Sequence, residues 1–129
     1  MKAETNRARR GHDFYPPDLA DLPKIHDQEG KEMNMIVHLH YFSPATDHFV
    51  TEVDPEQGIA FGYSIMYPHE GEFGYMDLPE MEEVNVSKEL IIEDENGHQK
   101  TAQYSIVIER DLYWEKKTLA EALKERRGG

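Results

Sequence analysis

The strongest constraint on the fold is an alternation of apolar and polar residues through the centre of the chain. The alternation begins near Met33 and continues to Tyr75, and turn-forming residues interrupt it at 43–47, 54–58 and 68–71. Successive side chains of a β-strand point to opposite faces, so a period of two predicts strands rather than helices. Short strands separated by turns are typical of an antiparallel meander.

The same alternation predicts which side chains the sheet buries. One face would carry apolar residues and pack against the rest of the protein, and the other would carry polar and small residues. The predicted buried face comprises Met35, Val37, Leu39, Tyr41, Phe49, Thr51, Val53, Ile59, Phe61, Tyr63 and Ile65. The predicted polar face comprises His38, His40, His48, Glu52 and Ser64, with Ala60 and Gly62 leaving space beside them.

Two segments after this alternation predict helices. Pro79 stands near the start of residues 78–84, and proline is well tolerated in the first turn of a helix. Thr118 and Glu121 have the spacing of a capping box, in which a hydroxyl and a carboxylate satisfy the first free N–H groups of a helix. They predict the start of a C-terminal helix.

A hairpin is predicted between these two helices, because strand candidates at 89–93 and 103–109 flank the Asn96-Gly97 turn signal. The fold class that follows is α+β, with an antiparallel sheet meander of about five or six strands packed by one or two helices, including the C-terminal one. Residues 1–13 are polar and basic and are expected to form a flexible arm. Residues 14–127 are expected to form a single domain.

Charge is distributed unevenly along the chain. The formal net charge is -12, and residues 32–87 contain eleven Asp and Glu but no Lys or Arg. An acidic sheet repels phosphate groups, which argues against direct nucleic-acid binding and favours a cationic protein surface or a metal ion. Alternatively, the charge only keeps the protein soluble. The carboxylates expected to be exposed are Glu70, Glu72, Glu80, Glu82 and Glu83.

The absence of cysteine excludes disulfides, thiolate nucleophiles and cysteine-bound zinc. The first residues lack the apolar core of a secretory signal, and no apolar run approaches membrane-spanning length. We therefore expect a cytoplasmic protein without a membrane partner.

Several short sequence words occur in order along the chain. They are Thr51-Glu52-Val53-Asp54-Pro55, Ala60-Phe61-Gly62-Tyr63, Gly74-Tyr75-Met76-Asp77-Leu78 and Glu109-Arg110-Asp111-Leu112-Tyr113-Trp114. With these words the chain resembles a family of small bacterial proteins known only as a domain of unknown function, with members on plasmids, integrated elements and phages. In that family the short helix leads almost directly to the last word, whereas an extra segment at about 85–101 separates them here. The resemblance implies no reaction, because the family has no established activity.

Two groups of residues could carry chemistry. The three histidines of the predicted polar face, with Glu52, could hold a divalent metal or act as acid and base near neutral pH; otherwise they belong to a solvated strand face. We expect no bound cofactor, apart from a divalent metal if these histidines act together. Arg110 is the only cation in residues 101–115. It is expected to pair with Glu109 and Asp111, or else to bind a phosphate or carboxylate ligand.

Three functions remain open. The first is a non-enzymatic binding protein of a bacterial mobile element or phage that uses its acidic surface to contact a protein partner, such as a host defence factor. The second is a small metal- or histidine-dependent enzyme. The third is a protein that sequesters a small ligand or nucleotide with its tyrosines. The Gly128-Gly129 end resembles that of ubiquitin-like modifiers, but it follows a predicted helix rather than a strand.

Overall fold

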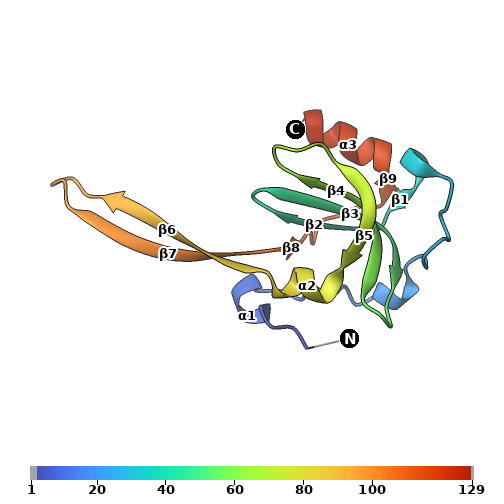
Figure 1. Ribbon diagram of the computed structural model, residues 1–129, viewed down its shortest axis with the longest axis horizontal. Helices are drawn as coiled ribbons and strands as arrows, with labels where there is room; N and C mark the ends of the chain where they lie inside the picture. Colours follow the sequence, from blue (N-terminus) through green and yellow to red (C-terminus); the bar gives the residue numbers. More distant parts are fainter. Residues whose placement is uncertain (1–2, 129) are drawn as a thin grey trace.

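The computed structural model describes residues 3–128, which form a sheet-centred body and a long hairpin that projects from it (Figure 1). The central antiparallel sheet has five strands in the order β5-β4-β3-β2-β8. The strands are β2 (Leu39–Ser43), β3 (Thr46–Asp54), β4 (Ile59–Met66), β5 (Glu72–Asp77) and β8 (Glu109–Arg110). Strands β2 to β5 pair in chain order, so the predicted α+β class and meander are confirmed.

The other elements cover this sheet or extend from it. They are α1 (Arg7–Arg10), η1 (Leu19–Asp21), η2 (Glu32–Asn34), β1 (Ile36–Val37), α2 (Leu78–Glu83), β6 (Asn85–Glu93), β7 (Gln99–Val107), β9 (Lys117–Thr118) and α3 (Leu119–Gly128). The predicted capping box opens α3, because Glu121 N donates to Thr118 Oγ1 and Thr118 N donates to Glu121 Oε1, both at 3.2 Å. No helix within residues 3–128 is both long enough and apolar enough to cross a membrane.

One face of the central sheet, which we call the α2 face, carries the larger core. Leu39, Tyr41 and Val50 from the sheet cluster with Leu78 and Met81 of α2. The segment before η1 completes this cluster through Phe14, whose ring stacks on Tyr41 with 4.2 Å between ring centroids.

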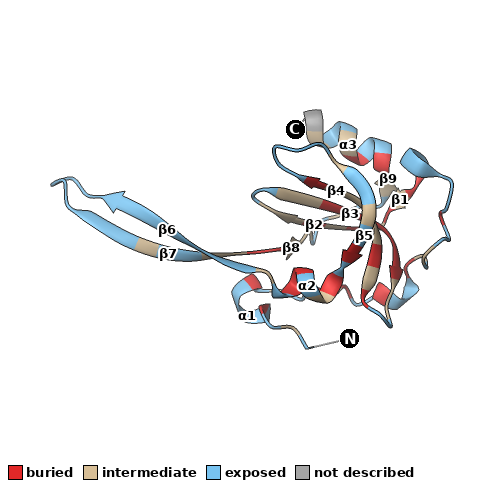
Figure 2. Cartoon of the chain, viewed as in Figure 1, coloured by how far each residue is buried: buried red, intermediate tan, exposed pale blue. Residues whose placement is uncertain are grey.

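The opposite face, which we call the α3 face, is covered by the C-terminal helix. Phe49 and Ile65 cluster with Leu119 and Ala122 of α3. The Trp114 ring packs against the same cluster. Buried residues therefore occur on both faces of the sheet (Figure 2).

The register of the β2–β3 hairpin, which pairs Tyr41 with His48, and a β-bulge in β3 together overturn the predicted division into one buried and one polar face. The pairing of β3 with β4 shifts between Val50 and Glu52, which leaves Thr51 as an extra residue. Before the bulge, His48 and Val50 share the α2 face; after it, Glu52 pairs with Phe61 on the α3 face. His48, Thr51 and Glu52 are all buried, because helices or loops cover both sides.

Residues 3–13 differ from the predicted flexible arm. Arg10 of α1 is only 4% exposed and its Nη1 donates to Glu82 Oε2 at 2.9 Å. Asn6 is also buried and its backbone N–H donates to the same carboxylate. The basic segment is thus held against the body, because it neutralises a buried acid of α2.

The projecting hairpin, which we call the β6–β7 arm (residues 85–107), forms where the Asn-Gly signal predicted a turn. Gly97 has φ +80°, the left-handed conformation that glycine adopts readily. The strands pair in a continuous register from Asn85 with Val107 to Glu93 with Gln99. The predicted strand at 103–109 is divided, because β7 ends at Val107 and β8 starts at Glu109 to pair with β2.

Candidate functional site

The register of the β6–β7 arm places most of its apolar side chains on one side of the ribbon. Val86 lies opposite Ile106, and Leu90 lies opposite Ala102, so these pairs point to the same side of the ribbon. This side, which we call the apolar arm face, comprises Val86, Lys88, Leu90, Ile92, Lys100, Ala102, Tyr104 and Ile106. The reverse side comprises Asn85, Ser87, Glu89, Ile91, Glu93, Gln99, Thr101, Gln103, Ser105 and Val107.

The apolar arm face is open to solvent. All nine residues of β6 are exposed, and Leu90 and Tyr104 keep about half of their surface in water (51% and 48%). Figures 1 and 2 show the ribbon extending away from the body over most of its length. A two-stranded ribbon with no covering layer is marginal by itself. An exposed apolar face of this kind is typical of surfaces that contact another molecule.

A groove of about 540 Å³ connects this face to the body. Its arm side is formed by Val86, Lys88 and Ile106, at the base of the ribbon. The body side comes from the α2 face of the sheet and from α2 itself, and includes Ser43, Thr46, His48, Ser64, Met66, Tyr75, Met76, Glu80 and Met81. The apolar arm face thus continues into a concave surface at its base.

His48 and Ser64 form a pair in this groove. His48 Nδ1 lies 2.9 Å from Ser64 Oγ, and burial lowers the pKa of His48, although the negative charge of Asp47 opposes this effect. A neutral histidine beside a hydroxyl is one component of an activated nucleophile. The ring nitrogen Nε2 hydrogen-bonds to no side chain among the described residues, so no acid orients this base. The pair alone does not constitute a catalytic site.

His40 belongs to a separate network on the α3 face. Its Nε2 lies 2.7 Å from Asp47 Oδ1 and its Nδ1 lies 3.0 Å from Asp111 Oδ2. Asp47 Oδ2 also accepts hydrogen bonds from Arg126 and Tyr67. Burial raises the pKa of Asp47, but the hydrogen bonds from His40 and Arg126 outweigh it and leave that pKa below its ordinary value. The network ties α3 to the sheet.

The predicted meeting of three histidines and Glu52 is therefore wrong. His48 and His40 lie on opposite faces of the sheet, and His38 lies outside it, between the end of β1 and the start of β2. His38 Nδ1 is buried and has no hydrogen-bond partner among residues 3–128, and burial lowers the pKa of this histidine. Within residues 3–128, no group of three or more His, Asp or Glu side chains is arranged to hold a metal ion.

The predicted exposure of the acidic residues needs one correction. Glu82 is only 2% exposed, because it accepts hydrogen bonds from Arg10 and from the backbone of Thr5 and Asn6. Burial raises the pKa of Glu82, but these hydrogen bonds outweigh it and keep the pKa below its ordinary value.

The exposed acids do not form one surface. Glu70 and Glu72 lie at the start of β5, whereas Glu80 and Glu83 lie on α2, beyond its other end. A six-residue strand separates the two groups by roughly 20 Å. Each group is thus a local cluster of charge.

Arg110 holds the N-terminal segment rather than a neighbouring acid. Its Nε donates to the backbone carbonyl of Asp13 at 3.0 Å. Asp111 instead pairs with His40, and Glu109 lies 3.7 Å from His12. The predicted ion pair within Glu109-Arg110-Asp111 does not form among the described residues, because each of the three side chains has a different partner.

The apolar arm face was missed at the level of sequence, although a signal existed. Val86 and Leu90 lie four residues apart with polar residues between them, and Ala102 and Tyr104 alternate with polar residues on the returning strand. The hairpin signal fixes the alignment of the two strands, so their apolar residues could have been placed on one side. The alternation does not reveal that no other layer covers that side.

Comparison with known proteins gives one match. No curated protein and no solved structure matches the chain. A family model described as "Protein of unknown function (DUF2958)" matches residues 19–111, which include the central sheet, α2 and the β6–β7 arm. The match covers well over half of the chain and agrees with the resemblance found in the sequence words. The chain belongs to the family described as Protein of unknown function (DUF2958).

Proposed function

We propose that the protein is a non-enzymatic binding protein that holds a protein partner against the apolar arm face. The observation that supports this proposal is the exposure of Leu90, Ile92 and Tyr104 on one side of a projecting ribbon. The cores of protein interfaces are rich in aromatic and aliphatic side chains, and tyrosine is a frequent energetic centre. The groove at the base of the arm enlarges the surface available to the partner.

The charges on this face indicate the chemistry of the partner. Lys88 and Lys100 stand among the apolar residues, and no carboxylate shares their side of the ribbon. Two copies of this chain stacked by these faces would bring four ammonium groups together, which is unfavourable. We therefore propose a different protein, whose contact surface is apolar and bordered by carboxylates.

The acidic clusters of the body have a secondary role in this proposal. Glu70, Glu72, Glu80 and Glu83 can steer the orientation of a charged partner, but they do not form a contiguous binding surface. The resemblance to a family with members on plasmids, integrated elements and phages suggests a host protein, such as a defence factor, as the partner. We assign no catalytic residue.

The test compares two faces of one ribbon. Wild-type protein, the double variant Leu90→Asp/Tyr104→Asp and the matched control Thr101→Asp/Gln103→Asp are used to isolate partners from a bacterial host. The control adds the same charge to the reverse side of the arm. We expect a partner retained by wild type and control and lost by the apolar-face variant, with affinity reduced at least about tenfold, since a central interface residue contributes about 2 kcal/mol or more.

Two results would contradict the proposal. One is a partner that binds all three proteins equally, which would place the interface elsewhere. The other is a wild-type dimer in light scattering that dissociates in Leu90→Asp/Tyr104→Asp, which would show that a second copy covers the face.

A further inference from the structure

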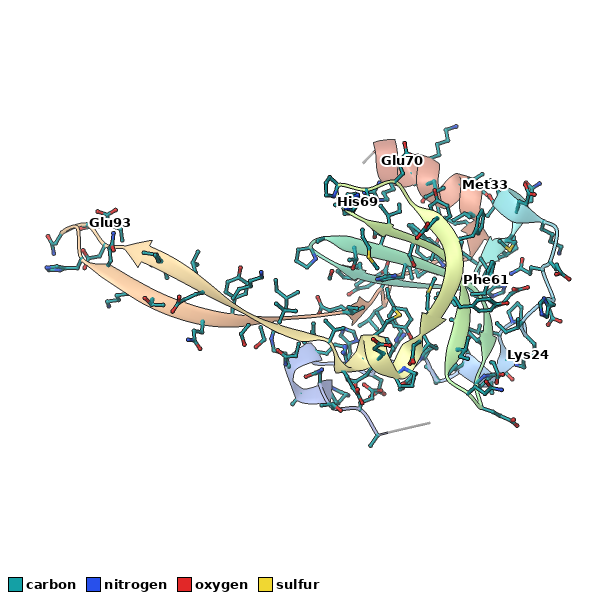
Figure 3. All side chains as sticks on the ribbon, in the orientation of Figure 1. Lys24, Met33, Phe61, His69, Glu70 and Glu93 are labelled. Atoms are coloured by element: carbon teal, nitrogen blue, oxygen red, sulfur yellow. The ribbon has the colours of Figure 1, made fainter. Side chains whose placement is uncertain are left out.

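A second cavity lies on the α3 face, away from the arm. It has a volume of about 210 Å³ and is formed where the loop before β1 covers strands β3, β4 and β5. Figure 3 labels Phe61 on the sheet and Lys24 and Met33 on the covering segment. The side chains that decide its chemistry are Phe61, Phe73, Tyr75, Glu52, Glu29 and Glu32.

Three aromatic rings form one wall of this cavity. Phe61 and Tyr75 meet edge to face with 5.2 Å between ring centroids, and Phe61 and Phe73 lie nearly parallel with centroids 6.3 Å apart. Phe73 and Tyr75 are 40% and 64% exposed, so these rings are accessible from solvent. The face of an aromatic ring is the negative end of its quadrupole and attracts cations.

Glu52 supplies a buried charge at the same place. The residue is only 3% exposed, and its Oε2 accepts a hydrogen bond from the backbone N–H of Gln28 at 2.5 Å. Its Oε1 makes no hydrogen bond or ion pair with any described residue. Oε1 is not fully buried, so it can face a cation inside the cavity that Glu52 lines.

Two more carboxylates line the cavity, those of Glu29 and Glu32. His26 also lines it, with its Nδ1 3.4 Å from Glu29 Oε1, and no Lys or Arg among the described residues does so. An anion would therefore be repelled. Among the described residues, His26 and Glu32 are the non-glycine positions with positive φ, at +78° and +47°, and both line this cavity. Backbone strain of this kind is concentrated at functional sites.

We propose that this cavity binds an organic ammonium group. An ammonium with alkyl substituents matches the aromatic wall and the carboxylates at once, as in cages that recognise quaternary ammonium ligands. The volume is below the roughly 300–1,000 Å³ of pockets for drug-sized ligands, which fits a single ammonium head group. The group could belong to a free small molecule or to a methylated lysine side chain, and both present the same chemistry.

This site is independent of the proposed partner interface. The cavity lies on the α3 face, whereas the groove at the base of the arm lies on the α2 face. Tyr75 alone reaches both, because it sits on the edge strand β5. Failure of one proposal therefore leaves the other standing.

The test uses a charged probe and its neutral isostere. Choline and 3,3-dimethylbutan-1-ol differ mainly in a quaternary nitrogen that replaces a carbon, so any difference in affinity reports the positive charge. We expect choline to bind at least about tenfold more tightly, since a desolvated cation–π contact is worth about 2 kcal/mol or more. Titration followed by amide NMR should move the Gly30 signal, because Gly30 lines the cavity.

Two variants connect the binding to the named side chains. Glu52→Gln keeps an acceptor for the Gln28 N–H but removes the charge, and should weaken choline at least about tenfold while leaving the neutral isostere unchanged. Tyr75→Leu tests the aromatic wall at an exposed position, in case Glu52→Gln does not fold. Glu70→Gln, an exposed acid that is not part of the cavity lining, is the matched control and should bind like wild type.

Peptides distinguish the two sources of the ammonium group. A peptide with trimethyl-lysine that binds more tightly than choline would indicate a protein side chain, and weaker binding would indicate a free small molecule. Equal affinity for choline and its neutral isostere would overturn the proposal. The proposal would also be overturned if neither choline nor the peptide reached saturation at millimolar concentration. Unchanged choline binding in folded Glu52→Gln and Tyr75→Leu would overturn it as well.

Discussion

The body and the β6–β7 arm of this protein differ in how far they bury their side chains. In the body, Val37, Tyr41 and Leu119 are fully buried, and even charged residues such as Arg10 and Glu82 find partners inside the fold. In the arm, every residue of β6 is exposed, including apolar ones. The same alternating sequence pattern thus yields a packed sheet in one region and an uncovered ribbon in the other.

This difference shows where the stability of each region comes from. The body is stabilised by the burial of apolar area on both faces of its sheet. The arm has backbone pairing and cross-strand contacts, but no second layer to exclude water. An uncovered apolar face contributes little to stability in the free protein, and its apolar area becomes useful when a partner covers it.

The comparison is tested most strongly by placing one aspartate in each region. Val37→Asp puts an unpaired charge into a fully buried position and should cost about 4 kcal/mol or more, enough to abolish folding. Leu90→Asp, at a position that is 51% exposed, should change the free energy of unfolding by about 0.5 kcal/mol or less. Thermal and urea unfolding of both variants measure the difference. Similar destabilisation by the two substitutions would show that the arm is packed in solution.

The buried ion pair should give the next largest effect. Arg10→Ala leaves the Glu82 carboxylate buried without its cation and should cost about 3–5 kcal/mol. Arg7→Ala removes the neighbouring exposed pair with Asp13 and should cost about 1 kcal/mol at most. Urea unfolding compares the two. If Arg10→Ala were as mild as Arg7→Ala, the N-terminal segment would be the flexible arm that the sequence suggested.

Part of this structure was predictable, because the signals involved are local. The alternation, the turns, Asn96-Gly97 and the Thr118–Glu121 capping box each depend on residues close together in the chain. They correctly predicted the α+β class, the meander, the hairpin and the C-terminal helix.

The candidate sites depend on information that is not local. The bulge between Val50 and Glu52 puts Glu52 and Val53 on the faces opposite to those that strict alternation along β3 predicts, and a single inserted residue leaves no clear mark in the sequence. In the sequence, Glu82 looks like any exposed acid of an amphipathic helix. Its burial depends on Arg10, which is 72 residues away in the chain and is adjacent to it only in the folded protein. The candidate site residues were therefore misplaced even where their strands were predicted correctly.

The network around Asp47 should make a smaller, pH-dependent contribution to the stability of the body. The pKa of Asp47 is lowered in the folded state, below the value of about 3.9 expected for the unfolded chain. The folded protein then binds fewer protons than the unfolded one, so this contribution is complete above about pH 5 and is lost as the pH falls through the folded-state pKa.

Asp47→Asn should therefore cost about 1 kcal/mol at pH 7, since it weakens the hydrogen bonds with His40 and Arg126. The difference from wild type should shrink as the pH is lowered below about 4. Urea unfolding at a series of pH values measures this slope, with Glu56→Gln, an exposed acid, as the control. A difference that grew on acidification would mean that Asp47 holds its proton more tightly in the folded protein.

The smallest expected change in stability comes from removing the outer part of the arm. Replacing residues 89–103 with Asn-Gly would join the paired residues Lys88 and Tyr104 through a two-residue turn and remove the outer ribbon. The removed segment has exposed residues at nearly every position, so the free energy of unfolding of the body should change by about 0.5 kcal/mol or less.

Hydrogen exchange on the wild-type protein gives the matching observation. Amides of the outer arm should exchange through local opening, whereas those of β3 should exchange only on global unfolding. A shortened protein that lost several kcal/mol, or arm amides protected as strongly as β3, would show that the arm belongs to the same cooperative unit as the sheet. Unchanged stability together with loss of the partner would instead separate the two regions completely, with folding carried by the body and recognition by the arm.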